Sequence, residues 1–171
     1  MFPAICESIS AAGDWQSVLT SVSAIPDEQR RSFSWIWPTE SCLEDLRECF
    51  RAHGIHNVLS IGCGSGLLEW ILQESCALKV SGIELDKSWW TSAYAPATFI
   101  PLSFTGSSLD EDFLQHCAPG EPFILLFCYF NNGGAFWDYL RRFQGDFVMI
   151  AGPRDGADAI KKQPDAEKEV P

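Results

Sequence analysis

Apolar residues along the chain follow two alternating patterns. Five short, mainly apolar segments predict β-strands, at 58–61, 80–85, 98–102, 123–130 and 147–151, and the segment at 123–130 is continuously apolar. Between them, apolar residues at helical spacing predict helices, at 67–75, 89–94, 109–116 and 135–143. Parallel neighbours need a crossover connection, and right-handed crossovers place helices on both faces of a sheet. The pattern therefore predicts an α/β fold with a doubly wound, mostly parallel sheet.

The first forty residues are the least regular part of the sequence. A helix is predicted from Asp14 to just before Pro26, because one of its faces carries four apolar residues, Trp15, Val18, Leu19 and Val22. Large rings then alternate along RRSFSWIWP, at Phe33, Trp35 and Trp37. Such a stripe is more often part of the core or of a packed arm, although three rings ahead of a binding domain also suit the roof of a pocket.

The clearest helix of the N-terminal half follows this arm. Ser41 and Glu44 are spaced as a capping box, and Gly54 supplies a glycine at the C-terminal end. The apolar residues at helical spacing are Cys42, Leu43, Leu46, Cys49 and Phe50. We divide the chain into a helical and aromatic arm (1–40), the sheet domain (41–153) and a charged tail (154–171). We expect the tail to be disordered because few of its residues are apolar.

The composition indicates one folded domain with an acidic surface. The chain has 171 residues, of which 46% are hydrophobic, and 12 basic against 23 acidic residues give a net charge of −11. This charge disfavours nucleic acid and anionic membranes as partners, although a local basic patch would override it. The N-terminus has no signal-peptide pattern, and no segment approaches the roughly 18 apolar residues that span a bilayer. We expect a soluble, cytoplasmic or otherwise intracellular protein.

Cysteine and histidine form no metal-binding or disulfide pattern. The seven cysteines include no CxxC pair. Most lie in apolar segments, as Cys42, Cys49 and Cys128 do, and we expect them to be reduced and mostly buried. None of the three histidines lies close in sequence to a paired cysteine or carboxylate motif, so we predict no metal site.

The most informative segment is VLSIGCGSGLLEW, at 58–70, in which a predicted strand enters Gly62, Gly64 and Gly66 and continues into a helix. Glycines here allow a sharp turn and a close approach of a ligand to the backbone, and the helix N-terminus offers free N–H groups. A dinucleotide fingerprint requires a small residue at position 67, where this chain has Leu67, and no Walker Lys-Ser/Thr pair follows. The loop therefore favours a nucleoside ligand other than NAD, FAD or a P-loop triphosphate.

The second predicted strand ends in two carboxylates, Glu84 and Asp86, about twenty residues after the glycines. A doubly wound sheet places an acid at this position, where it accepts hydrogen bonds from both hydroxyls of a ribose. Glu84 is the better candidate of the two. A solvated strand end is the alternative interpretation of a lone acid.

VLSIGCGSGLLEW followed by VSGIELD resembles motif I and the following acidic motif of class I S-adenosylmethionine-dependent methyltransferases. The motifs cover 57–86, and a matching order of strands and helices extends to about residue 153. The resemblance implies a Rossmann-like domain whose cofactor, S-adenosylmethionine, contacts the segment containing Ser60, Gly62, Cys63, Gly64 and Gly66, with Glu84 on its ribose diol. The family usually has Asp or Glu at the position of Ser60. Its sheet also normally ends with two further strands, which we expect to be missing after residue 153.

No pattern identifies a catalytic residue. CYFNNGG, at the end of the fourth predicted strand, is neither an Asn/Asp-Pro-Pro-aromatic motif nor a Pro-Cys motif. Asn131 or Asn132 could bind a methyl acceptor and Tyr129 could lend a ring edge, but a turn and a helix cap explain Asn-Asn-Gly-Gly better. Trp89 and Trp90 could flank an adenine, although packing is the commoner role.

Two functions from different classes follow. The first is a methyltransferase-like protein that transfers a methyl group from S-adenosylmethionine to an unidentified acceptor, a small molecule or a protein. The second is a catalytically inactive module of the same fold that serves in interaction or in cofactor sensing. A dinucleotide oxidoreductase is disfavoured by Leu67. The acceptor and the oligomeric state are not indicated by the sequence.

Overall fold

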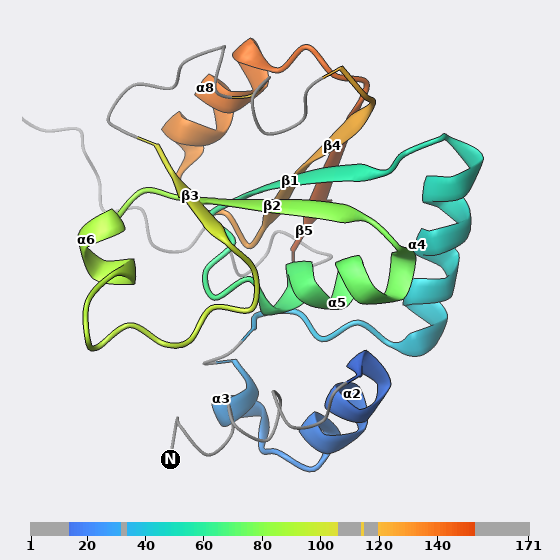
Figure 1. The fold of residues 1–171 in the computed structure, drawn as a ribbon, viewed down its shortest axis with the longest axis vertical. Coiled ribbons are helices and arrows are strands. Elements are labelled where there is room, and N and C mark those ends of the chain that lie inside the picture. The colour runs from blue at the N-terminus through green and yellow to red at the C-terminus, as the bar shows by residue number, and fades with distance from the viewer. Residues whose placement is uncertain (1–13, 32–33, 106–113, 115–119, 153–171) are drawn as a thin grey trace, which may run out of the picture.

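The computed structural model describes residues 14–31, 34–105, 114 and 120–152. Within these ranges the chain forms one five-stranded sheet in the order β3-β2-β1-β4-β5 (Figure 1). The strands are β1 (Asn57–Ile61), β2 (Lys79–Glu84), β3 (Leu102–Phe104), β4 (Phe123–Cys128) and β5 (Phe147–Ala151). Every neighbouring pair is parallel. The prediction of a doubly wound parallel α/β sheet is confirmed.

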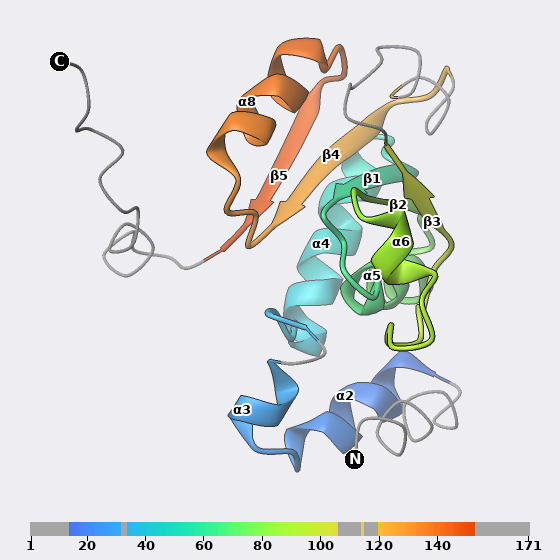
Figure 2. The ribbon, with the colours of Figure 1, turned by 90° about the vertical axis from the view of Figure 1, so that its left-hand side faces the viewer.

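Helices cover both faces of the sheet, as Figure 2 shows. Helices α4 (Glu40–Ala52) and α5 (Leu67–Cys76) lie on one face, and α8 (Gly133–Arg142) lies on the other. Alternate residues of β4 separate the two cores: Ile124 and Leu126 pack with α4 and α5, whereas Leu125 and Phe127 pack with α8. Such a strand, buried on both faces, explains why its sequence is continuously apolar.

The arm that precedes the sheet packs under α5. Its first helix, α2 (Trp15–Ser23), begins where the Asp14 carboxylate accepts a 2.7 Å hydrogen bond from the Ser17 N–H, as the sequence predicts. Val18 and Val22 of this helix join the core formed by α4 and α5. A short helix, α3 (Asp27–Arg30), follows Pro26. The arm is therefore joined to the domain by a shared core.

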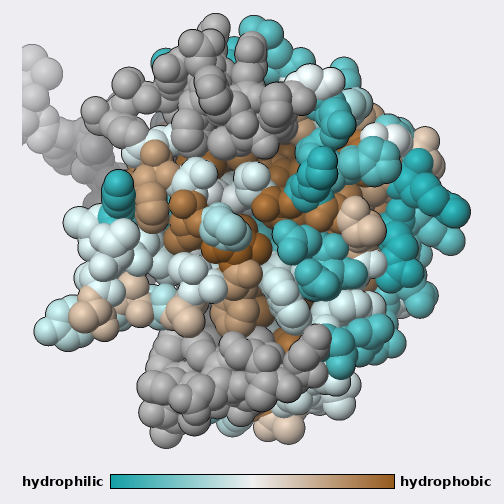
Figure 3. Space-filling model, viewed as in Figure 1, coloured by the Kyte–Doolittle hydropathy of each residue, from teal (hydrophilic) through white to brown (hydrophobic). Residues whose placement is uncertain are grey.

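Two expectations for α4 were wrong. The cap is Thr39, whose hydroxyl accepts a 3.2 Å hydrogen bond from the Cys42 N–H, so that Ser41 already lies within the first turn. Cys42 and Cys49 are exposed because α4 buries only the narrow stripe of Leu43 and Phe50. Most of the other exposed residues of α4 are charged, and Figure 3 shows mainly hydrophilic residues on the right-hand side, where α4 lies in Figure 1.

The segment between β2 and β3 also differs from the prediction. The third strand was expected at 98–102 but pairs only from Leu102, opposite Gly82. Pro101 has no N–H for a ladder, and the preceding residues bind elsewhere: the Phe99 N–H donates to Ser65 O over 2.8 Å. Helix α6 (Lys87–Trp90) begins earlier than predicted, because the carboxylate of Asp86 caps it by accepting from the Trp89 N–H.

Some predictions fall outside the described residues. Of the helix expected at 109–116 only Leu114 is described, and it is buried against β4. Phe33 and the tail at 154–171 lie outside the described residues. No helix in the described part of the chain is long and apolar enough to cross a membrane.

Candidate functional site

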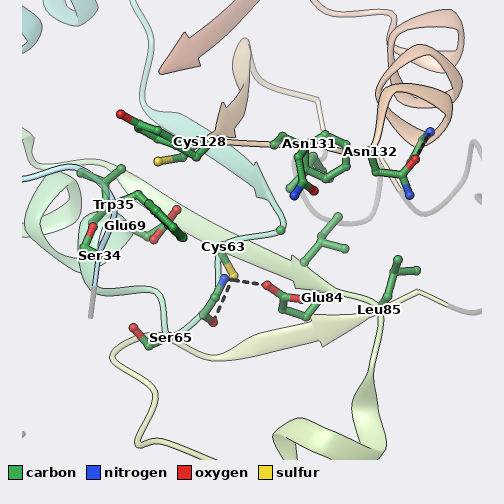
Figure 4. A pocket seen from close by; sticks show the side chains of 18 of the residues that line it. Ser34, Trp35, Cys63, Ser65, Glu69, Glu84, Leu85, Cys128, Asn131 and Asn132 are labelled. Carbon is green, nitrogen blue, oxygen red and sulfur yellow. Dashed lines mark hydrogen bonds between the residues drawn. The ribbon is translucent and has the colours of Figure 1, made fainter. Parts of the chain in front are cut away.

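The carboxyl ends of the strands border a cavity of about 900 Å³, which falls in the size range of small-molecule sites. Its wall includes the loop after β1, the ends of β2 and β4, the start of α8 and part of the arm (Figure 4). This is the edge at which open parallel sheets bind ligands, because the strand order reverses there, with β2 and β4 on opposite sides of β1.

The glycine loop is built as the sequence predicts. Gly62, Gly64 and Gly66 all have left-handed backbones, with φ of +69°, +62° and +75°. No atom lies within 4 Å of the position that a Cβ of Gly64 would take, so the backbone is bare on that side. At Gly66 a Cβ would lie 2.3 Å from Cγ1 of Ile100, so glycine is needed there for packing. The loop therefore leaves an open backbone surface at Gly64.

Glu84 faces this loop. Its Oε1 accepts a 2.6 Å hydrogen bond from the Gly64 N–H, a contact drawn as a dashed line in Figure 4. The Gly62 N–H donates to Ile83 O over 2.9 Å, which holds the start of the loop against the end of β2. Asp86 serves as the cap of α6 instead. The preference for Glu84 over Asp86 as the acid at the loop agrees with this geometry.

The structure adds a second carboxyl that the sequence analysis missed. Glu69, in the first turn of α5, is 1% exposed and lies in the cavity wall. Its Oε1 accepts a 2.6 Å hydrogen bond from Oγ of Ser60, which is fully buried on β1. The signal in the sequence was an acid within the apolar segment LLEWIL, at 67–72, which amphipathic spacing alone does not explain.

Burial dominates the acid–base behaviour of Glu69. Loss of solvation raises its pKa from 4.5 to about 7, and the nearby Glu84 carboxylate adds to the increase, whereas the hydrogen bond from Ser60 lowers it. Among the described residues the ion pairs join Arg30 to Asp27 and Arg141 to Asp138. Within that part of the chain, neither Glu69 nor Glu84 has a cationic partner.

The two cysteines of the cavity wall are poor nucleophiles. Burial raises the pKa of the Cys128 thiol to about 12, with a further contribution from Glu69. Burial, together with Glu69 and Glu84, also raises the pKa of the Cys63 thiol well above its ordinary value. Because the thiolate is the reactive form, neither sulfur is set up for covalent catalysis at neutral pH.

The end of β4 forms the opposite wall. Tyr129 has a left-handed backbone, φ +48°, and its ring stacks on the ring of Trp35 from the arm, with centroids 5.6 Å apart. Asn132 caps α8 by accepting from the Ala135 N–H, so the helix-cap interpretation of Asn-Asn-Gly-Gly is confirmed. Asn131 is exposed in the cavity wall. Strained backbone of this kind often occurs at binding sites, which makes Tyr129 a candidate contact.

Aromatic residues of α6 do not pack as expected. The helix has no buried residue, Trp89 is 47% exposed and Trp90 lines the cavity. Over the described ranges, no group of three or more His, Cys, Asp or Glu side chains is placed to hold a metal ion. The site thus combines a bare loop, two carboxyls and an aromatic wall.

Comparison of the chain with protein-family models, with curated proteins and with solved structures finds no match.

Proposed function

We propose that the protein binds S-adenosylmethionine in this cavity and is a methyltransferase-like protein. The observation that carries the proposal is the 2.6 Å hydrogen bond between the Gly64 N–H and Glu84 Oε1, which brings a bare glycine loop and a strand-end acid together at the edge of the sheet where ligands bind. The same segments carry the resemblance to motif I and the following acidic motif.

The residues present fit such a ligand. Gly64 offers unobstructed backbone, and only one oxygen of the Glu84 carboxylate takes part in the bond to the loop, so the other oxygen is available to a ribose hydroxyl. Trp90 in the cavity wall offers a ring for an adenine. We assign Gly62, Gly64 and Glu84 to the nucleoside end of the ligand.

S-adenosylmethionine supplies an activated methyl group when it is bound. Transfer of that group to an acceptor is an in-line displacement, so the chain needs mainly to align the acceptor and exclude water. Tyr129, Trp35 and Asn131 line the part of the cavity suited to an acceptor, with ring faces and one amide. We propose a small molecule or a protein side chain as the acceptor, because the chain is strongly acidic overall.

The alternative, a binding module without catalysis, also has an observation in its favour. The thiols of Cys63 and Cys128 are held protonated, and the side chain of Asn132 is engaged as a helix cap. These three side chains are among the polar groups at the ends of β1 and β4, and none of them is free to act on an acceptor. A module of this kind would bind the ligand as a sensor or scaffold.

Titration calorimetry tests binding. We expect micromolar affinity for S-adenosylmethionine and for S-adenosylhomocysteine, and a loss of about 10- to 100-fold in Glu84→Gln, since a hydrogen bond to a charged group contributes roughly 1.5–3 kcal/mol. Glu74→Gln, at an exposed acid on α5, is the matched control. Absence of heat at millimolar ligand, or preferential binding of NAD, would refute the proposal.

Transfer of radiolabel from S-adenosylmethionine to pools of small molecules, proteins or RNA then separates the two functions. Label in one pool identifies a methyltransferase and its acceptor class. Tight binding without any transfer identifies the non-catalytic module.

A further inference from the structure

Two carboxyls line the cavity, and the proposed ribose contact uses only Glu84. Glu69 is left with 1% of its surface exposed, and its hydrogen-bond donors are neutral: the hydroxyl of Ser60 at 2.6 Å and its own backbone N–H. A buried acid without a cation is costly when ionised, and folded proteins rarely keep one unless it is paired. The free protein thus holds an acid whose counter-charge is missing from the described residues.

The neighbours of Glu69 cannot supply that counter-charge. The carboxylate of Glu84 at the end of β2 acts on Glu69, and Glu69 in turn acts on the thiols of Cys63 in the loop and Cys128 at the end of β4. All three are neutral or negative. Two guanidinium groups, of Arg31 and Arg142, also line the cavity, but neither forms an ion pair with Glu69.

Glu69 and Glu84 are placed for two different parts of one ligand. In Figure 4 they lie on either side of Cys63. Because both line the same cavity, a ligand that contacts both has to extend across the glycine loop. The end at Glu84 suits hydrogen-bond donors, such as hydroxyls, and the end at Glu69, when its carboxyl is ionised, suits a positive charge.

We propose that Glu69, oriented by Ser60, is the subsite for the positively charged group of the bound ligand, an ammonium or a sulfonium. This inference rests on the proposed function, because an adenosyl ligand places its hydroxyls at Glu84. It also explains why this chain has Ser60 where the family that it resembles usually has an acid. Here the carboxyl comes from Glu69 of α5, and it reaches the cavity beside the Ser60 hydroxyl on β1. Ser60 is a positioning residue.

Three ligands distinguish the charges. S-adenosylmethionine carries both a sulfonium and an ammonium, S-adenosylhomocysteine carries only the ammonium, and 5′-methylthioadenosine carries neither. In calorimetry we expect Glu69→Gln to lower the affinity for the charged ligands by about 10- to 100-fold and the affinity for 5′-methylthioadenosine by less than about 2-fold. If Glu69→Gln lowers the affinity for both charged ligands, Glu69 binds the ammonium. If it lowers the affinity for S-adenosylmethionine alone, Glu69 binds the sulfonium. Glu74→Gln is the control.

Equal weakening of all three ligands by Glu69→Gln would overturn the inference, because it would mean that Glu69 only supports the start of α5. If none of the three ligands binds the unaltered protein, it is the proposed function that fails. A second measurement needs no variant: the affinity for S-adenosylmethionine, but not for 5′-methylthioadenosine, should fall up to about tenfold per pH unit below pH 7, where Glu69 takes up a proton. Parallel pH profiles for the two ligands would equally overturn it.

Discussion

Glu69→Gln should stabilise the free protein, and the gain should depend on pH. Glutamine has the shape of a protonated glutamate, and it can still accept the hydrogen bond from Ser60. In the folded state the pKa of Glu69 is about 7, against an ordinary value of 4.5. The folded state therefore holds its proton in a pH range where the unfolded chain has lost it.

The sign and the size of this change in stability follow from the linkage between proton binding and folding. Between pH 4.5 and 7 the folded state binds more protons than the unfolded state, so the contribution of Glu69 to stability falls as the pH rises. Because one pKa unit corresponds to about 1.4 kcal/mol, the loss is about 1 kcal/mol at pH 5.5 and about 3 kcal/mol at pH 8. The glutamine that replaces Glu69 does not titrate, and the variant should gain these amounts relative to the unaltered protein.

Urea unfolding of both proteins at pH 5.5 and pH 8 measures the difference, and both values lie above the sequence pI of about 4.5. Other acids titrate in this range, but they are common to both proteins and cancel. Glu74→Gln, exposed on the same helix, should stay within about 0.5 kcal/mol of the unaltered protein at both values. The reasoning would be refuted if Glu69→Gln gained the same free energy of unfolding at both pH values, or if it were less stable than the unaltered protein at pH 8. Stabilisation together with weaker ligand binding would be the trade-off expected of a functional buried acid.

Further predictions concern the backbone and the thiols. Gly64 and Gly54 both have left-handed backbones, with φ of +62° and +65°, and a methyl group added at either position enters open space. Gly64→Ala and Gly54→Ala should therefore each lose about 1 kcal/mol of stability. Only Gly64→Ala should weaken S-adenosylmethionine binding in calorimetry. Equal affinity in the two variants would exclude the loop from the site. Ala77→Gly should raise the free energy of unfolding by about 1 kcal/mol in urea titration, because Ala77 ends α5 at φ +55°; a destabilised variant would contradict this. Iodoacetamide at pH 7.5, followed by peptide mass spectrometry, should label the exposed Cys42 well before Cys63, whose thiol is held protonated; the reverse order would contradict the burial of Cys63.

Most of the fold was determined by local sequence. Short, mainly apolar segments identified β1, β2, β4 and β5 to within about two residues. The pattern is strongest in β4, which is buried on both faces of the sheet, and weaker in the edge strand β5, where Val148 and Ile150 are exposed. The third strand was misplaced because Phe99 and Ile100 contact the glycine loop: Phe99 donates to Ser65 O, Ile100 fills the space beside Gly66, and pairing starts only after Pro101. Apolar character alone does not distinguish these roles.

Side-chain burial on α4 shows the same limit. The spacing of Cys42 and Cys49 suits an apolar face, but the width of that face is set by how closely the sheet and α5 approach: Leu43 and Phe50 are buried, Leu46 is partly buried, and the two cysteines are exposed. The cap at Thr39 depends on the extended entry of the chain, φ −81° and ψ 159°, which follows from the path of the arm.

The sequence by itself determined the glycine loop and an acid at the end of the next strand, because backbone freedom at Gly64 and the position of Glu84 in a strand are local properties, whereas the contact between the two residues comes from the pairing of β1 with β2. Only the tertiary structure decided that Glu69 belongs to the same cavity. Its carboxyl meets Ser60 across nine residues, through the packing of α5 against β1, and its pKa is raised by the burial that this packing creates. The order of residues along the chain sets where the glycine loop lies, whereas the charges around the site depend on how the folded chain packs.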